Sequence, residues 1–561
     1  MKKNYCLFAL LVFFCSAGIA QQKTATSKTS TTTYPTSVNR PKLVVGMVVD
    51  QMRWDYLYRF YNRYTNGGFR RLINQGFSAE NTFIPYTPTY TACGHTSIYT
   101  GSVPAINGII GNSWYDASLK RTMYCAEDTS VTTVGSNTMN GRMSPKNMLS
   151  NTITDELRLA TNFRSKVIGI ALKDRGSILP AGHSANAAYW YDPQTGDWIT
   201  SSYYMKELPA WVQDYNKIKL ANKFYEKNWN TLYPIDTYVQ SSKDANDYER
   251  KFKGEPTSAF PHSLKLYMGK DYEMIKSTPY GNTITLDMAK LAILSEDLGQ
   301  DDITDFLAVS CSSTDLVGHQ FGPNSVEIED TYLRLDKDLE EFFNYLDSKV
   351  GKGNYLFFLT ADHGAAHAQG FLKEHSLPGR NSNDGAISKQ LNVLLEQKFN
   401  IKKPIKTSTN NQIYFDHDNI DKSKVDFEAM KIFSIDFLRK QPGFQNAVDL
   451  SKLGSATLPE KMKMAITNGY NARRSGDIYY ALEPNWFSSG GTGTTHGAWN
   501  PYDSHIPLVF MGWNVKPGKT NTEHHMTDIA ATIAAMLRIQ MPNGCVGKPI
   551  TELTHQTLSF K

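Results

Sequence analysis

Five short runs of hydrophobic, mostly β-branched residues constrain the fold of this chain more than any other feature. The first run reads KLVVGMVVD and covers residues 42–50. Side chains that would point to both faces of such a strand are apolar, so the run predicts a central parallel strand covered by helices on both sides. Comparable runs lie at residues 165–172, 305–313, 354–364 and 505–512.

Helical patterns lie between or after these runs. Residues 326–350 repeat apolar side chains near a 3.6-residue period, and residues 526–537 do the same, with Thr527 as the expected N-cap. Strands that alternate with helices predict an α/β fold with a central, mostly parallel sheet flanked by helices. Residues 180–290 and 375–495 fit this pattern poorly. We expect both to be large insertions around the carboxyl edge of the sheet, where such sheets place their sites.

The first twenty residues have the three parts of a secretory signal peptide. Two lysines are followed by the apolar run Tyr5–Phe14 and by small residues up to Ala20. The apolar run is shorter than the about 20 residues that a membrane-spanning helix needs. We therefore predict cleavage after Ala20 and a periplasmic or secreted location for the rest of the chain.

The exported chain is expected to consist of a disordered Thr/Ser-rich linker at residues 21–40 and one domain with insertions at residues 41–561. Loss of Lys2 and Lys3 lowers the formal net charge from +5 to +3. This charge is too small to indicate nucleic acid as the principal partner. No later segment predicts a membrane span, so we expect no stable membrane partner. We also expect a monomeric chain, although no sequence feature fixes the oligomeric state.

Four cysteines remain after the signal peptide. In an oxidising compartment they allow disulfides in three possible full pairings, and buried free thiols are an equally good alternative. These residues are Cys93, Cys125, Cys311 and Cys545.

Acidic residues and histidines follow several of the predicted strands or lie in a Gly-rich loop. Each alone is a weak signal, because an Asp after a strand is usually a turn or cap residue and most of the thirteen histidines, including His183, His524 and His525, are expected to be ordinary. Together, three carboxylates and three imidazoles suffice for two divalent metals, and mixed N/O ligands suit Zn²⁺ better than Ca²⁺ or Mg²⁺. The set is Asp50, Asp315, His319, Asp362, His363 and His496.

The stretch YTPTYTACGHTSIYTG, residues 86–101, contains five threonines and one serine. This composition is unfavourable for a helix and for a core. The stretch is either a polar loop that leads into a helix or the source of a nucleophilic hydroxyl. A threonine hydroxyl needs a metal or base to ionise it at neutral pH, and a two-metal site would supply that activation for in-line displacement at phosphorus.

Five segments of the chain resemble motifs of the alkaline phosphatase superfamily, in its order and across nearly the whole mature chain. Within the superfamily the sequence is most similar to the PafA-type periplasmic phosphate monoesterases, which use threonine as nucleophile. The Cys-x-Pro-x-Arg sequence of the sulfatases does not occur at Cys93. The segments are KLVVGMVVDQMRWDYL, TPTYTACGHTSIYTG, STDLVGH, TADHG and GTGTTHG.

The resemblance implies specific roles for these residues. It implies that Thr91 attacks phosphorus, that Asp50, Thr91, Asp362 and His363 hold one zinc, and that Asp315, His319 and His496 hold a second. It also implies that Asn112, Lys173 and Arg175 meet the phosphate oxygens, with the Lys-x-Arg pair on one side of an extended step. His95 and Cys93 are expected to be structural.

The function that follows is hydrolysis of small-molecule phosphate monoesters by an exported enzyme with two Zn²⁺ ions and a phosphothreonine intermediate. A monoester carries two negative charges and three exposed oxygens, so two extra cations favour it over a diester. A nucleotide phosphodiesterase or pyrophosphatase of the same superfamily remains the alternative among enzymes. A non-catalytic binding protein is the alternative outside them. The sequence does not name the physiological monoester.

Overall fold

The computed structural model describes residues 38–554. The predicted signal peptide and residues 21–37 of the predicted linker lie outside the described residues. At the end of that linker, Arg40 is held in place, because its Nε donates a hydrogen bond of 2.6 Å to the carbonyl oxygen of Leu537.

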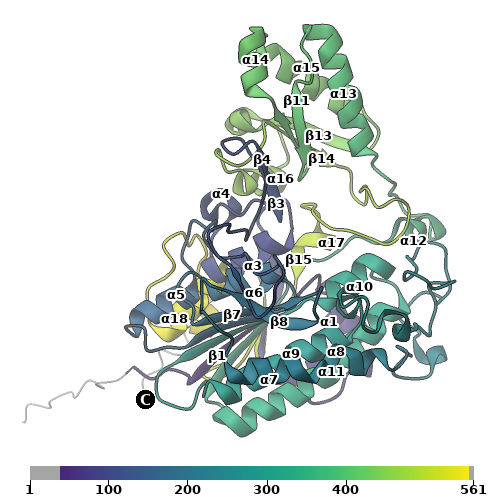
Figure 1. The fold of residues 1–561 in the computed structure, drawn as a ribbon. Helices are drawn as coiled ribbons and strands as arrows, with labels where there is room; N and C mark the ends of the chain where they lie inside the picture. The colour runs from purple at the N-terminus through teal and green to yellow at the C-terminus, as the bar shows by residue number, and fades with distance from the viewer. Residues whose placement is uncertain (1–37, 555–561) are drawn as a thin grey trace, which may run out of the picture. The chain divides into compact units, whose positions relative to one another are not determined.

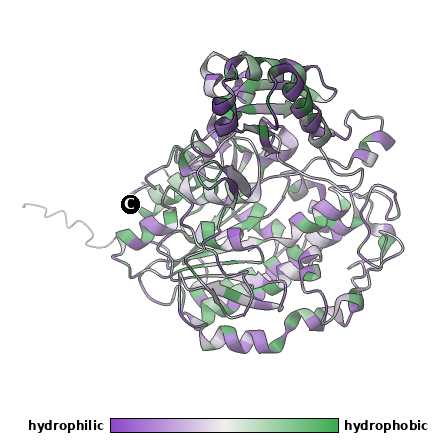
Figure 2. Cartoon of the chain, turned by 45° about the horizontal axis from the view of Figure 1, so that its top comes forward, coloured by the Kyte–Doolittle hydropathy of each residue, from purple (hydrophilic) through white to green (hydrophobic). Residues whose placement is uncertain are grey.

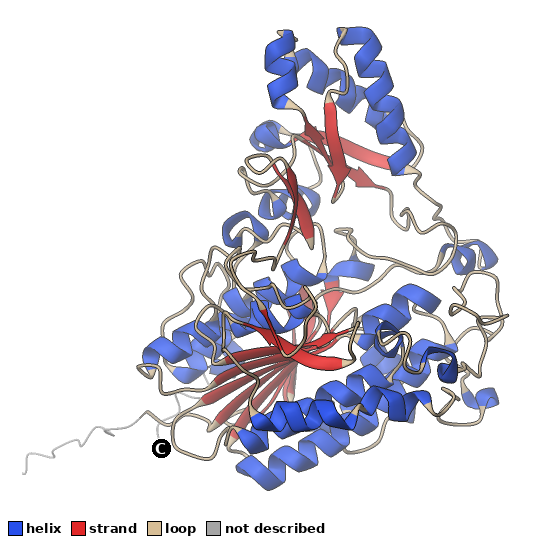
Figure 3. Ribbon diagram, in the orientation of Figure 1, coloured by secondary structure: helices blue, strands red, loops and turns tan. Residues whose placement is uncertain are grey.

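The core of the fold is five neighbouring parallel strands (Figure 3). Every residue of these strands is buried, as expected for strands covered on both faces. The prediction of an α/β fold with a central sheet is confirmed. In spatial order the strands are β10 (Tyr355–Thr360), β1 (Leu43–Val49), β9 (Asp305–Cys311), β6 (Val167–Ala171) and β7 (Ala187–Asp192).

Antiparallel strands extend this core to a mixed sheet of eleven strands within residues 38–554. The apolar run at 505–512 was expected to be another parallel strand, and this is wrong. It divides into β15 (His505–Ile506) and β16 (Leu508–Gly512), and β16 runs antiparallel to β10. An apolar run that is buried on both faces gives no information about strand direction, so it could not distinguish a parallel from an antiparallel strand.

The remaining strands lie at the two edges of the sheet. On one side β2 (Phe77–Phe83) pairs with β16 and β15 and also with β17 (Gly518–His525). On the other side β8 (Asp197–Ser201) and β5 (Thr133–Val134) follow β7.

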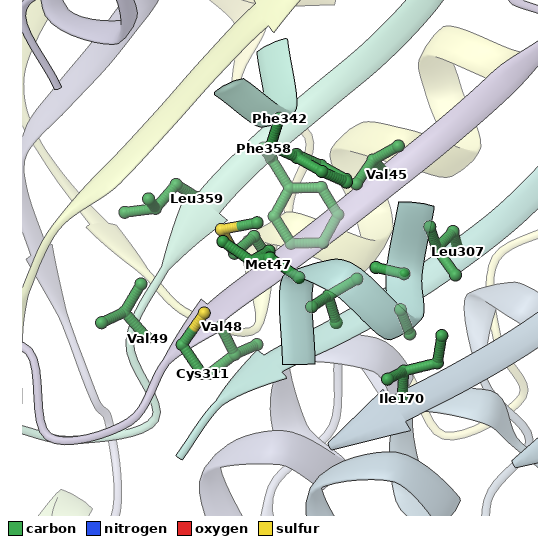
Figure 4. Packing of buried hydrophobic residues seen from close by; sticks show 14 of the residues in the cluster. Val45, Met47, Val48, Val49, Ile170, Leu307, Cys311, Phe342, Phe358 and Leu359 are labelled. Atoms are coloured by element: carbon green, nitrogen blue, oxygen red, sulfur yellow. The ribbon is translucent and has the colours of Figure 1, made fainter. Parts of the chain in front are cut away.

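Helices cover both faces of the sheet (Figure 1). On one face lie α9 (Tyr280–Ser295) and α11 (Val326–Leu346), and on the other lie α3 (Thr91–Thr100), α6 (Asp174–Ala181) and α18 (Asp528–Leu537). These helices carry both hydrophobic and hydrophilic residues, as Figure 2 shows. Phe342 of α11 packs among the side chains of β1 and β10 (Figure 4).

The prediction that the Thr527 side chain caps α18 is wrong. Thr527 does precede α18, but its backbone is helical and its side chain makes no capping hydrogen bond. The next residue, Asp528, receives amide hydrogen bonds from His525 and Lys548 instead. A carboxylate in the first turn also interacts favourably with the helix dipole.

A second, smaller sheet forms within residues 375–495. It is antiparallel, with its own hydrophobic core, and α13 (Asp384–Phe399) and α15 (Phe427–Arg439) pack with it. In spatial order its strands are β11 (Ile405–Thr409), β12 (Gln412–Phe415), β14 (Ile478–Leu482) and β13 (Phe444–Asp449).

The four cysteines of the described chain are free thiols, and three of them are buried. Of the alternatives that the sequence left open, the structure shows the free thiols.

Candidate active site

Three of the central parallel strands deliver a carboxylate to the same edge of the sheet. Asp50 directly follows β1, Asp362 follows β10, and Asp315 lies in the first turn of α10 (Ser313–Phe321), directly after β9. All three side chains are buried. Because the carboxyl ends of parallel strands meet at one edge, residues far apart in sequence converge here.

The threonine-rich stretch forms a helix, contrary to its composition. Residues 91–100 make up α3, and every residue in it is buried. The hydroxyl of Thr96 donates to the carbonyl oxygen of Ala92 and that of Thr100 to the carbonyl oxygen of Thr96, each at 2.7 Å. These bonds satisfy the hydroxyls of Thr96 and Thr100 inside the helix, and tertiary packing overrides a weak intrinsic propensity.

Thr91 is the first residue of α3 and points into the carboxylate edge. Its backbone amide belongs to the first turn, where helix amides have no intrahelical partner and favour an anion. Gly94 allows the close approach, because a Cβ there would lie 2.5 Å from both the Cβ and the carbonyl oxygen of Asp362.

Four atoms that can bind a metal lie close together, and one of them is Nε2 of His363. This nitrogen lies 3.5 Å from Thr91 Oγ1, 3.5 Å from Asp50 Oδ1 and 3.4 Å from Asp362 Oδ2. Ligands held about 2.0–2.2 Å from a tetrahedral zinc lie about 3.3–3.6 Å apart. The spacing of these atoms therefore fits the first predicted zinc set.

The hydrogen bonding of two oxygens in this group is a second, independent observation that fits a bound cation. Asp50 Oδ1 and Asp362 Oδ2 are buried and have no hydrogen-bond partner among the described residues. The other oxygen of each carboxylate is satisfied. Asp50 Oδ2 accepts from Lys173, and Asp362 Oδ1 accepts from the amides of Gln51 and His363. Buried, unpartnered carboxylate oxygens that face a histidine nitrogen are what a bound cation would stabilise.

A second group surrounds Asp315. Its Oδ1 lies 3.2 Å from His319 Nε2 and 3.7 Å from His496 Nε2. Ligand atoms of Asp315, His363 and His496 also lie within 4.8 Å of one another. The ring of His363 stacks on that of His496 with centroids 3.5 Å apart, so the two groups are adjacent.

The three imidazoles are held in the orientation that a metal requires. Nδ1 of His319, His363 and His496 lies 2.8, 3.0 and 2.7 Å from the backbone carbonyl oxygens of Thr494, Gly364 and Thr89. A carbonyl oxygen accepts only, so each Nδ1 carries the proton and each Nε2 presents a lone pair to the site.

Lys173 joins the two groups. Its Nζ lies 2.6 Å from both Asp50 Oδ2 and Asp315 Oδ2. The Oδ1 atom of each carboxylate lies near the histidine nitrogens instead. One lysine does not balance three buried carboxylates. Burial, together with the charges of Asp315 and Asp362, raises the pKa of Asp50 well above its usual value. Burial would also raise the pKa of Asp315, but His319 and Lys173 outweigh it and hold that pKa well below the usual range.

Arg175 does not share an extended step with Lys173, as the sequence suggested. Lys173 is the N-cap of α6 and Arg175 lies in the first turn of that helix. Both line one cavity of about 260 Å³, but Arg175 turns toward Tyr124, whose hydroxyl lies 3.2 Å from its Nη1. Burial lowers the pKa of Arg175, but Tyr124 and Asp174 outweigh it, so the guanidinium remains charged.

Asn112 lies beside Thr91 with a defined amide orientation. Its Oδ1 accepts a hydrogen bond of 3.0 Å from the backbone amide of Ala92. Because that amide is a donor, the oxygen must occupy this position, and Nδ2 is the group left to donate elsewhere.

His95 lies next to Thr91. It is fully buried, with Nδ1 2.9 Å from the carbonyl oxygen of Thr91 and Nε2 2.9 Å from the hydroxyl of Ser310. Cys93 is also fully buried.

Sequence reasoning missed two residues that support the site. Gln51 has a left-handed backbone, with φ of 63°, and its Nε2 donates to Asp315 Oδ1 at 2.6 Å, so it ties the carboxylates of Asp362 and Asp315 together. Its position directly after a strand-ending aspartate was the only available signal. Tyr124, remote in sequence from Arg175, offered none.

Three comparisons with known proteins each found matches over most of the chain. The family model of type I phosphodiesterases and nucleotide pyrophosphatases matches residues 44–507. The chain is 60% identical to alkaline phosphatase PhoV of Synechococcus elongatus, over 99% of this chain and 100% of that one. It is also 53% identical to a protein of Myroides odoratus named calcium-transporting ATPase, over 99% and 100% of the two chains.

Among solved structures, the crystal structure of wild-type alkaline phosphatase PafA matches with a TM-score of 0.91 and 50% identity, and covers 92% of this chain and 100% of that one. Between residues 38 and 554, no helix has both the length and the hydropathy to cross a membrane.

Proposed function

Because the chain belongs to the type I phosphodiesterase and nucleotide pyrophosphatase family, within the alkaline phosphatase superfamily, we propose that it is an exported phosphate monoesterase with two zinc ions and a phosphothreonine intermediate. Its close relationship to alkaline phosphatases over nearly its whole length makes it a phosphomonoesterase. The proposal adds three points to this assignment: the identity of the metals, the phosphothreonine intermediate and the export of the chain.

One observation carries the chemistry. Thr91 Oγ1 and two unpartnered carboxylate oxygens, from Asp50 and Asp362, surround one histidine nitrogen at distances that suit a tetrahedral ion. When bound, the two ions supply positive charge that favours the ionised threonine hydroxyl and the departing alcohol oxygen.

The protein's own groups then arrange the substrate. The first-turn amide of Thr91, Asn112 Nδ2 and the cations Lys173 and Arg175 are the donors available to the three non-bridging phosphate oxygens. Thr91 Oγ1 forms the new bond to phosphorus as the bond from phosphorus to the alcohol oxygen breaks, and the alcohol takes up a proton. A water molecule then attacks the phosphothreonine, which frees inorganic phosphate and restores the hydroxyl.

Arg175→Ala is expected to lower kcat/KM for a monoester by about 10²-fold and to change a matched diester several-fold at most. A monoester presents a third unesterified oxygen and a second charge, and Arg175, which lines the same cavity as Lys173, is the cation that we propose to meet them. The measurement compares phenyl phosphate with methyl phenyl phosphate on zinc-loaded enzyme. The exposed Arg473→Ala serves as the matched control.

Equal losses on both esters would contradict the monoester assignment. A wild type that prefers the diester would favour the nucleotide phosphodiesterase alternative, which the name of the matching family also includes.

Tyr124 is expected to position Arg175 rather than to touch substrate. Its hydroxyl donates to Asp174 Oδ1 at 2.5 Å and accepts from Arg175. Tyr124→Phe should lower the monoester kcat/KM by about tenfold, close to the lower end of the cost of one lost hydrogen bond to a charged group. In the Arg175→Ala background the same change should have no further effect. Additive losses would show that Tyr124 acts independently, and Tyr115→Phe, which removes a hydroxyl from the neighbouring strand, is the control.

A further inference from the structure

A second cavity, of about 170 Å³, shares a wall with the site. That wall is formed by His496 and by Tyr90, which directly precedes Thr91. The ring of Tyr90 meets the ring of His496 edge-on with centroids 5.6 Å apart, and His496 stacks on His363 on its other side. The cavity therefore begins one side chain away from the reacting atoms, next to the ligand group that would stabilise the departing alcohol.

Aromatic side chains dominate the lining. They come from segments that are far apart in sequence: β14 and the loop after it in the small sheet, the loop that carries His496, and α17 (Pro501–Ser504) (Figure 1). The rings are those of Tyr90, Tyr479, Trp486, Phe487, Trp499 and Tyr502.

The lining is acidic in composition, and burial raises the pKa of one of its two carboxyl groups, Asp503, to about 7. Two carboxylates, Asp384 and Asp503, line the cavity, and its lining residues include no lysine or arginine. Asp503 is fully buried, and its Oδ2 accepts from the amides of Gly497 and Ala498 at 2.9 and 2.7 Å. Its Oδ1 has no partner among the described residues.

The carboxylate of Asp384, the other acidic group in the lining, accepts hydrogen bonds from the hydroxyls of Ser382 and Tyr480, at 2.8 and 3.2 Å. Aromatic faces together with carboxylates form an environment that attracts an organic cation and repels an anion.

We propose that this cavity receives the alcohol part of the substrate and selects a small alkylammonium group carried on that alcohol. The inference depends on the proposed monoesterase function and names the substrate class for it. An alkylammonium group can make cation–π contacts with the aromatic faces and is attracted by the two carboxyl groups. A nucleotide or a carboxylate-bearing alcohol would instead bring negative charge to an acidic wall.

The test uses two esters of the same shape and different charge. Phosphocholine and 3,3-dimethylbutyl phosphate differ in the replacement of the quaternary nitrogen by carbon. The wild type should prefer phosphocholine in kcat/KM by at least about tenfold. Because the ammonium group also makes the alcohol a better leaving group, the decisive quantity is the change of this preference in variants.

Asp384→Asn and Trp486→Leu should each reduce the preference at least about threefold, with the loss concentrated in phosphocholine. Asp418→Asn, an exposed aspartate of the same subdomain that pairs with Lys120, is the charge-matched control and should leave the preference unchanged. A preference that neither cavity variant alters would overturn the proposal.

The outcomes also separate this proposal from the proposed function. If the wild type hydrolyses both esters and the variants affect them equally, only the cavity assignment fails. If it hydrolyses neither ester but cleaves methyl phenyl phosphate, the monoesterase function fails. If Trp486→Leu impairs phenyl phosphate as much as phosphocholine while Asp384→Asn affects neither, the cavity binds a neutral aryl group and the cationic assignment is wrong.

Discussion

Thr91→Ala is expected to lower kcat/KM for phosphate monoesters by at least about 10⁴-fold and to abolish the phosphoenzyme. Thr91 Oγ1 lies 3.5 Å from His363 Nε2, next to two buried carboxylate oxygens without partners among residues 38–554, and it is the hydroxyl that we propose as the nucleophile. The measurement is steady-state kinetics together with acid-quenched trapping of label from a ³²P-monoester.

The controls use hydroxyls of the same type and helix. Thr91→Ser should retain phosphoenzyme formation, because it keeps the oxygen. Thr100 lies nine residues after Thr91, and its hydroxyl donates to the carbonyl oxygen of Thr96 and accepts from the amide of Ser102. Thr100→Val removes this hydroxyl and should keep full labelling. Label recovered from Thr91→Ala at wild-type stoichiometry would show that another residue is the nucleophile.

The central sheet could be predicted because its signal is local. Runs such as residues 42–50 are apolar on both faces, and only a doubly covered strand buries both. The convergence of Asp50, Asp315 and Asp362 follows from the same fact, because parallel strands end at a common edge. Once β1, β9 and β10 are neighbours, their terminal carboxylates must be neighbours too.

The features that the sequence did not reveal depend on contacts between distant segments. The direction of β16 is set by its pairing with β10 and leaves no trace in its composition. The helix at residues 91–100 forms because Thr96 and Thr100 donate to the helix's own carbonyl oxygens and the surrounding core buries it. The orientation of Arg175, a helix residue, depends on Tyr124, which lies at the end of a strand 51 residues earlier in the chain.

Removal of the metals is expected to lower activity by at least about 10³-fold and to lower the thermal stability of the protein. The site buries three carboxylates against one lysine, so that a divalent ion supplies charge that the chain itself lacks. A ligand at 100 times its Kd adds about 2.7 kcal/mol to the free energy of unfolding, per ion. Dialysis against chelator, metal analysis and thermal unfolding measure these effects, and about two zinc ions per chain should rebind with activity.

Asp50→Asn should affect the melting temperature differently in the zinc-loaded and the chelated protein. In the zinc-loaded state it replaces an anionic ligand by a neutral one, so that the variant should lose about one ion per chain and melt at a lower temperature than the wild type. In the chelated state it removes one of three mutually repelling carboxylates, so that it should melt at the same or a higher temperature. His525→Ala, a histidine outside the site, should bind two ions and melt like the wild type in both states. Equal destabilisation of Asp50→Asn with and without zinc would mean that this carboxylate serves the fold rather than a metal, and the assignment of the first metal group would be wrong.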